Sequence, residues 1–191
     1  MIEGFNCPNC GAPADHAGAK LCTYCSTPFI LTRSSTQISI TNESLGKYTD
    51  LYKRITKDDP DFFDAQISLV LIYIKRKLFP LADNLSKKIL EDFPDESSAY
   101  LWRVMSLLSS GEIRKLKLSQ AREVAQLIHT GFSLSSEEGQ PEFVMLAKRL
   151  GEEYFNNHSV VIPDEIEEVL GVDVDTEYLE SNQSIAISIL G

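Results

Sequence analysis

Residues 59–65 read DPDFFDA and residues 93–99 read FPDESSA, so one pattern returns after 34 positions. In each copy a proline follows a helix-like segment, and the acidic residues after it suit the first turn of a new helix. Pro60 and Pro94 are 34 residues apart, and so are Ala65 and Ala99. This spacing predicts a repeated helical unit.

Apolar residues recur at helical spacing in the chain on both sides of these copies. The longest such runs lie between the two prolines, and another follows Pro141. The chain breaks at Ser109-Ser110-Gly111 in the second unit. Helices are therefore predicted from Asn42 or Ser44 onward and over residues 61–78, 80–92, 141–157 and 163–171.

A helix pair with a period of 34 residues resembles the tetratricopeptide repeat. Tyr73, Ala82 and Pro94 stand where that family favours a bulky aromatic, a small residue and a closing proline. The resemblance covers about residues 61–130, with one good repeat and one degenerate repeat. It implies stacked helical hairpins; a helical bundle with an accidental spacing is the alternative.

Four cysteines form two C-x-x-C pairs, Cys7 with Cys10 and Cys22 with Cys25, and eleven residues separate the pairs. Two such pairs supply the four thiolates that a tetrahedral zinc ion needs. The segment is too small to bury a useful hydrophobic core, so a metal ion would be what folds it. The spacing predicts one structural Zn²⁺ held by these four residues.

Other uses of the cysteines are less well supported by the sequence. Two disulfides would suit a secreted protein, and a redox dithiol needs only one pair. Iron–sulfur clusters use different cysteine spacings. His16 lies between the pairs, but four thiolates already fill a tetrahedron, so we expect a solvated loop histidine.

The residues around the pairs, from Cys7-Pro8-Asn9-Cys10-Gly11 to Cys22-Thr23-Tyr24-Cys25, resemble the zinc-ribbon family. The resemblance covers about residues 5–30 and departs from the family at Ser26, where a second glycine is usual. It implies that each pair lies at the tip of a β-hairpin. Because zinc ribbons occur in proteins of many functions, the resemblance implies a zinc module and little about its partner.

The fold class expected is mainly α, with a small β zinc ribbon. We predict a zinc ribbon over residues 1–33, a linker over 34–43, a helical domain over 44–158 and an acidic segment over 159–191. The last segment would contain a short helix and a terminal strand. That strand would pair with residues 37–41 or add to a sheet of another protein.

Charge and composition restrict the function. The net charge is −10, and residues 133–191 contribute two basic and thirteen acidic residues. An acidic chain repels phosphate backbones, which argues against a nucleic-acid partner. The sequence has no membrane-length apolar run and no export signal, so with reduced cysteines we expect a cytoplasmic protein.

No catalytic constellation is visible. The three histidines, His16, His129 and His158, have no histidine or cysteine at ligand spacing, and there is no phosphate-binding loop. The sequence therefore predicts no enzyme activity but a protein–protein interaction adaptor, with a protein partner or self-association. The alternatives are a nucleic-acid-associated zinc-ribbon protein and a regulatory subunit of a larger complex.

Overall fold

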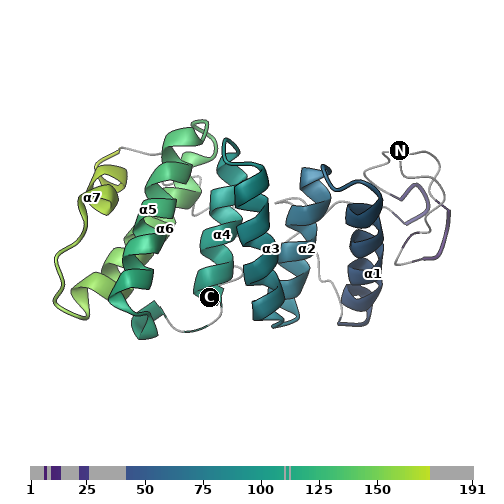
Figure 1. Ribbon diagram of the computed structural model, residues 1–191, viewed down its shortest axis with the longest axis horizontal. Helices are drawn as coiled ribbons and strands as arrows, with labels where there is room; N and C mark the ends of the chain where they lie inside the picture. Colours follow the sequence, from purple (N-terminus) through teal and green to yellow (C-terminus); the bar gives the residue numbers. More distant parts are fainter. Residues whose placement is uncertain are drawn as a thin grey trace. The chain divides into compact units, whose positions relative to one another are not determined.

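The computed structural model describes residues 7, 10–13, 22–25, 42–109, 111 and 113–172. Within these residues the chain is helical and forms no β-strand. The α-helices labelled in Figure 1 are α1 (Asn42–Asp58), α2 (Phe63–Lys75), α3 (Phe79–Asp92), α4 (Ser97–Ser109), α5 (Leu118–Leu134), α6 (Gln140–Leu150) and α7 (Asp164–Leu170). A 3-10 turn, η2 (Ile113–Lys115), and a π-helical segment, η3 (Gly151–Asn156), complete the described elements. None of the described helices is both long and apolar enough to cross a membrane.

The mainly helical fold is confirmed for the described residues. Helix α2 begins at Phe63 and α4 at Ser97, 34 positions apart, which is the spacing of the two prolines. Helix α4 ends at Ser109, where the sequence predicts a break. Of the expected ribbon the structure describes only residues 7, 10–13 and 22–25, which contain no β-strand. The linker up to residue 41 and the terminal strand lie outside the described residues.

The chain divides into two compact units, Met1–Leu85 and Ser86–Gly191, with the division inside α3. In the first unit, α1 packs on α2. The buried face of α1 has apolar residues at helical spacing: Leu45, Tyr48, Tyr52 and Ile55. The guanidinium of Arg76, just after α2, donates a hydrogen bond to Thr49 Oγ1 at 2.9 Å and so fastens the end of α2 to α1.

In the second unit, α5 packs against α4, α6 and α7. Gly131 lies at the closest approach. A Cβ atom there would lie 2.4 Å from Phe143 Cε1 on α6 and 2.7 Å from Tyr100 Cβ on α4. A glycine at this position therefore lets three helices come together where any side chain would clash.

Two helical segments are followed by a residue in the left-handed conformation that is not glycine. Lys77, with φ 57°, follows α2, and Ser159, with φ 53°, follows η3. After η3, the Val160 N–H bonds to Phe155 O at 3.0 Å and the Ser159 N–H to Asn156 O at 3.2 Å. This hydrogen-bond pattern usually places glycine at the left-handed position. The chain then runs extended to Pro163, the residue before α7.

The predicted helix over residues 141–157 is real but not uniform. Its last six residues form the π-helical segment η3, which begins at Gly151. Adjacent aromatic rings, Tyr154 and Phe155, are both buried there and meet edge to face with centroids 5.2 Å apart. Apolar periodicity indicated a helix but did not reveal this change of register.

Candidate metal centre

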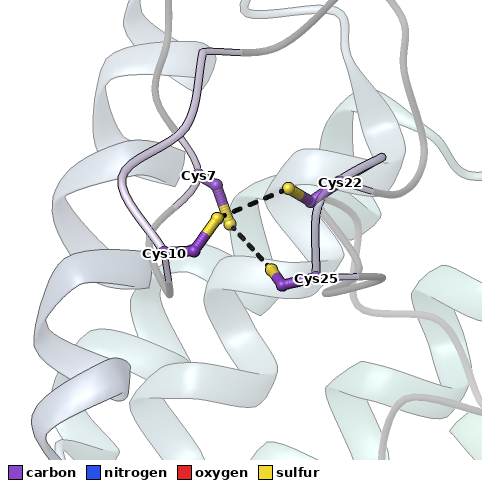
Figure 2. A group of neighbouring side chains, drawn as sticks. All are labelled: Cys7, Cys10, Cys22 and Cys25. Atoms are coloured by element: carbon purple, nitrogen blue, oxygen red, sulfur yellow. Dashed lines mark hydrogen bonds between the residues drawn. The ribbon is translucent and has the colours of Figure 1, made fainter.

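The four cysteines come together although they lie on two separate segments. Their Sγ atoms all lie within 4.8 Å of one another. Figure 2 shows the four side chains pointing toward a common centre, with Cys7 and Cys10 on one segment and Cys22 and Cys25 on the other. Two close contacts join the pairs: Cys7 Sγ lies 3.6 Å from Cys25 Sγ, and Cys10 Sγ lies 3.6 Å from Cys22 Sγ. All four are free thiols.

The first pair lies on a tight turn that the sequence explains. The Gly11 N–H bonds to Cys7 O at 2.9 Å, and the Cys7 N–H bonds to Ala12 O at 2.7 Å. These two bonds fold the backbone back on itself, and Gly11 takes a φ of 76° to allow it. That conformation is one that residues with a Cβ atom rarely adopt. Gly11 thus allows the sharp turn that follows the first pair.

The arrangement fits a tetrahedral metal ion. Zinc–thiolate bonds of about 2.3 Å place the corners of a tetrahedron about 3.8 Å apart. The observed sulfur–sulfur separations, from 3.6 Å up to 4.8 Å, bracket that edge length. Four cysteines would complete the coordination shell and leave no position for water or substrate. The arrangement is therefore consistent with a metal site.

The electrostatics of the cluster favour a cation. The backbone N–H of Ala12 lowers the pKa of the Cys10 thiol. Desolvation and the three neighbouring cysteines outweigh that effect and raise this pKa to about 12. The neighbouring cysteines raise this pKa through hydrogen bonds that favour the neutral thiol over the thiolate. A divalent cation at the centre would instead favour the thiolate form of all four cysteines.

A tyrosine on α1 also belongs to this environment. Tyr48 is buried, with 2% of its surface exposed. Its pKa is raised, first by burial and then by negative charge on Cys7, Cys25 and Cys22. Helical periodicity explains why Tyr48 lies on the buried face of α1. Its place beside the cysteines could not be read from periodicity, because the two segments are distant in sequence.

The described histidines, His129 and His158, and an arginine of α6 have partners of their own away from the cysteines. His129 Nε2 lies 2.8 Å from Glu168 Oε2, and Arg149 Nε donates to Glu153 Oε1 at 2.6 Å. The His158 ring packs on Tyr154 with centroids 4.5 Å apart. His16 lies outside the described residues. Among the residues that the structure describes, no second group of cysteine, histidine or carboxylate ligands suited to a metal ion is present.

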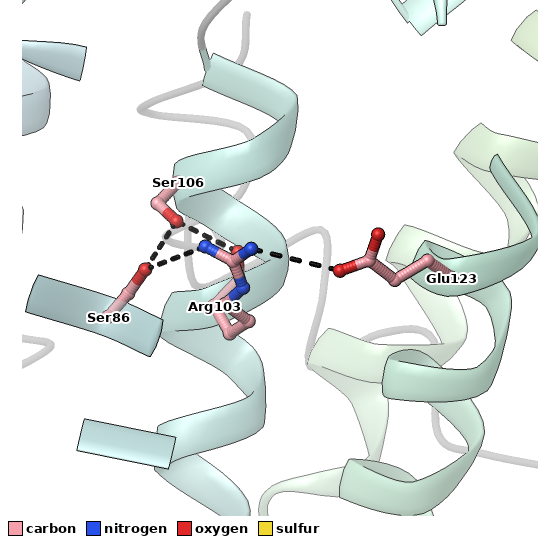
Figure 3. Close-up of polar contacts among 4 residues, drawn as sticks. All are labelled: Ser86, Arg103, Ser106 and Glu123. Atoms are coloured by element: carbon pink, nitrogen blue, oxygen red, sulfur yellow. Dashed lines mark hydrogen bonds and ion pairs between the residues drawn. The ribbon is translucent and has the colours of Figure 1, made fainter. Parts of the chain in front are cut away.

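One buried polar cluster escaped the sequence reasoning altogether. Ser86 Oγ and Ser106 Oγ are 2.7 Å apart, and Arg103, only 8% exposed, reaches Ser86 Oγ at 3.4 Å. On its other side the guanidinium lies 3.7 Å from a carboxylate oxygen of Glu123 on α5, as Figure 3 shows. These contacts join the end of α3, α4 and α5. Because every group is used internally, the cluster stabilises the second unit and offers no ligand site.

Comparison of the chain with protein-family models, with curated proteins and with solved structures gives no match.

Proposed function

We propose that this protein is a non-catalytic adaptor that binds a protein partner through its helices and holds one structural zinc ion on Cys7, Cys10, Cys22 and Cys25. The observation that carries the proposal is the convergence of four thiols at tetrahedral spacing. A four-thiolate site is typical of structural zinc, because it has no open coordination position. Zinc ribbons of this type bind or fold; they do not catalyse.

The helices support the adaptor part of the proposal. Helices α2 and α4 begin 34 residues apart, as expected for tetratricopeptide-like hairpins. Stacked hairpins offer extended surfaces for peptides and helices. The thiolate ligands need reduced cysteines, which supports a cytoplasmic location.

Two measurements, made one after the other, test the proposal. Elemental analysis of the freshly purified chain should find one zinc per molecule, and treatment with a thiol-modifying reagent should release it. Affinity capture from native lysate, with the full chain and with a chain lacking the last eight residues, should retain the same specific protein in both cases if the helices bind it. Absence of zinc would contradict the metal centre. Binding that falls steeply with salt and requires polynucleotide would favour the nucleic-acid alternative instead.

A further inference from the structure

The second unit contains a groove of about 380 Å³ that no residue of the metal centre touches. Arg122 and Gln126 on α5 form one side of the groove, and residues 161–165 form the other. Val161 stands at the edge with 86% of its surface exposed, the largest exposure among the large apolar residues described. Val161 therefore leaves an apolar side chain available at the edge of the groove.

The backbone of residues 160–163, which run from η3 to α7, is available for hydrogen bonding at its centre. The Val160 N–H is bonded to Phe155 O, and the Pro163 carbonyl accepts bonds from α7. Between them, the N–H groups of Val161 and Ile162 have no hydrogen-bond partner among the described residues. In an extended segment the N–H and C=O of one residue point to the same side, and those of the next residue point to the opposite side, so a peptide that adds as a strand can pair with the main chain of Val161 on one side.

The side chains of the groove indicate the charge of its occupant. Asp164 and Glu165 supply two carboxylates, and Arg122 supplies one guanidinium. None of the three makes an ion pair within the part of the chain that the structure describes. The groove is therefore net negative and favours an occupant with basic side chains. Gln126 adds an amide that can bond to a peptide main chain.

We propose that the groove between α5 and residues 161–165 binds an extended peptide with lysine or arginine side chains, which pairs through its main chain with Val161. The valine, Ile162 and Pro163 contribute apolar contact, and the carboxylates of Asp164 and Glu165 hold the basic groups. This inference rests on the proposed function, since it names the class of partner and the surface that receives it.

The test uses the full, zinc-loaded chain and three capped octapeptides. One alternates lysine with valine, one alternates glutamate with valine, and one is the lysine peptide with every backbone nitrogen methylated. The lysine peptide should bind, with amide shifts in NMR confined to the groove residues, and the affinity should fall as salt increases. The glutamate and methylated peptides should not bind.

Variants test the main-chain hydrogen bond and the charge contacts separately. Val161→Pro removes one N–H and should weaken the lysine peptide about fivefold, whereas Val161→Thr keeps the N–H and should bind normally. The double variant Asp164→Asn/Glu165→Gln should bind about two- to tenfold more weakly. Circular dichroism should show an unchanged helical melt for all of them.

Equal binding of the lysine and glutamate peptides, or full binding by Val161→Pro, would overturn the proposal. A third outcome would also overturn it: the lysine peptide fails to bind, the chain associates with itself, and Val161→Pro abolishes that association. The occupant of the groove would then be a second copy of the chain. If the full chain captures a protein partner that Val161→Pro retains unchanged, the groove proposal fails while the adaptor function stands. If the lysine peptide binds but no protein partner is captured, the adaptor function fails instead.

Discussion

The Sγ atom of Cys10 lies 3.6 Å from that of Cys22, although the two residues belong to different C-x-x-C pairs. The corresponding contact between Cys7 and Cys25 has the same length. Both contacts link one segment to the other. An ion at the centre would tie the two segments together, which is how a segment without a hydrophobic core of its own can hold a defined fold.

Cys10→Ser is expected to abolish stable zinc binding, because a neutral hydroxyl replaces one of the four thiolates. Elemental analysis after dialysis should find well under one zinc per chain, and a cobalt-loaded sample should lose its thiolate charge-transfer absorption. Thr23→Ser, in the second pair but not a ligand, is the matched control and should bind normally. The helical melt of the second unit should persist; its loss would contradict independent folding of that unit.

Tyr48→Phe is expected to weaken metal binding by about tenfold, since groups around the ligands tune a metal site. The substitution removes only the hydroxyl that lies in the field of Cys7, Cys22 and Cys25. Competition with a coloured chelator measures the effect. Tyr52→Phe, whose ring stacks on Tyr48 with centroids 6.0 Å apart, removes a hydroxyl from the same helix. Equal weakening by both variants would show a general loss of packing and not a role at the metal centre.

Zinc affinity is expected to rise with pH between about 6 and 8. The pKa of Cys10 is raised to about 12 in the metal-free chain, so this thiol holds its proton at neutral pH and the ion must displace it. Each proton released makes the apparent affinity up to about tenfold higher per pH unit. Calorimetry in two buffers of different ionisation enthalpy counts the protons. A pH-independent affinity would argue against thiolate ligation.

Gly131→Ala is expected to destabilise the second unit by about 1–3 kcal/mol. The added methyl group would overlap the Phe143 ring and Tyr100, and this clash outweighs the better helix propensity of alanine, about 1 kcal/mol. Gly46→Ala is the matched control, because Gly46 lies inside α1 with open space around it. That variant should be stabilised slightly. Denaturant unfolding measures both, and a stabilised Gly131→Ala would show that the three helices are less closely packed.

Ser159→Gly is expected to stabilise the second unit by about 0.5–1 kcal/mol, because glycine adopts the left-handed conformation without steric cost. Ser159 has φ 53° and is exposed, so little else changes on substitution. Ser159→Ala keeps the Cβ atom and should leave the free energy of unfolding nearly unchanged. Thermal unfolding of the original protein and the two variants measures the change in stability. An equal gain in stability for Ser159→Ala and Ser159→Gly would show that backbone strain at Ser159 is not the cause.

The sequence predicted features that depend on local chemistry. The prolines and the acids after them locate the starts of α2 and α4, since proline restricts the residue before it and acids suit a helix N-terminus. The two C-x-x-C pairs indicated four ligands, and their sulfur atoms lie together. In each case the signal lies within a few residues of the structure that it specifies.

Only the tertiary structure decided which distant groups meet. It placed Tyr48 beside the cysteines, enclosed Arg103 between Ser86 and Glu123, and set Gly131 against Phe143 and Tyr100. It also placed residues 161–165 across a groove from Arg122 and Gln126 of α5. Periodicity tells which face of a helix is buried but not what buries it, because packing partners are chosen by the whole chain and leave no local mark in the sequence.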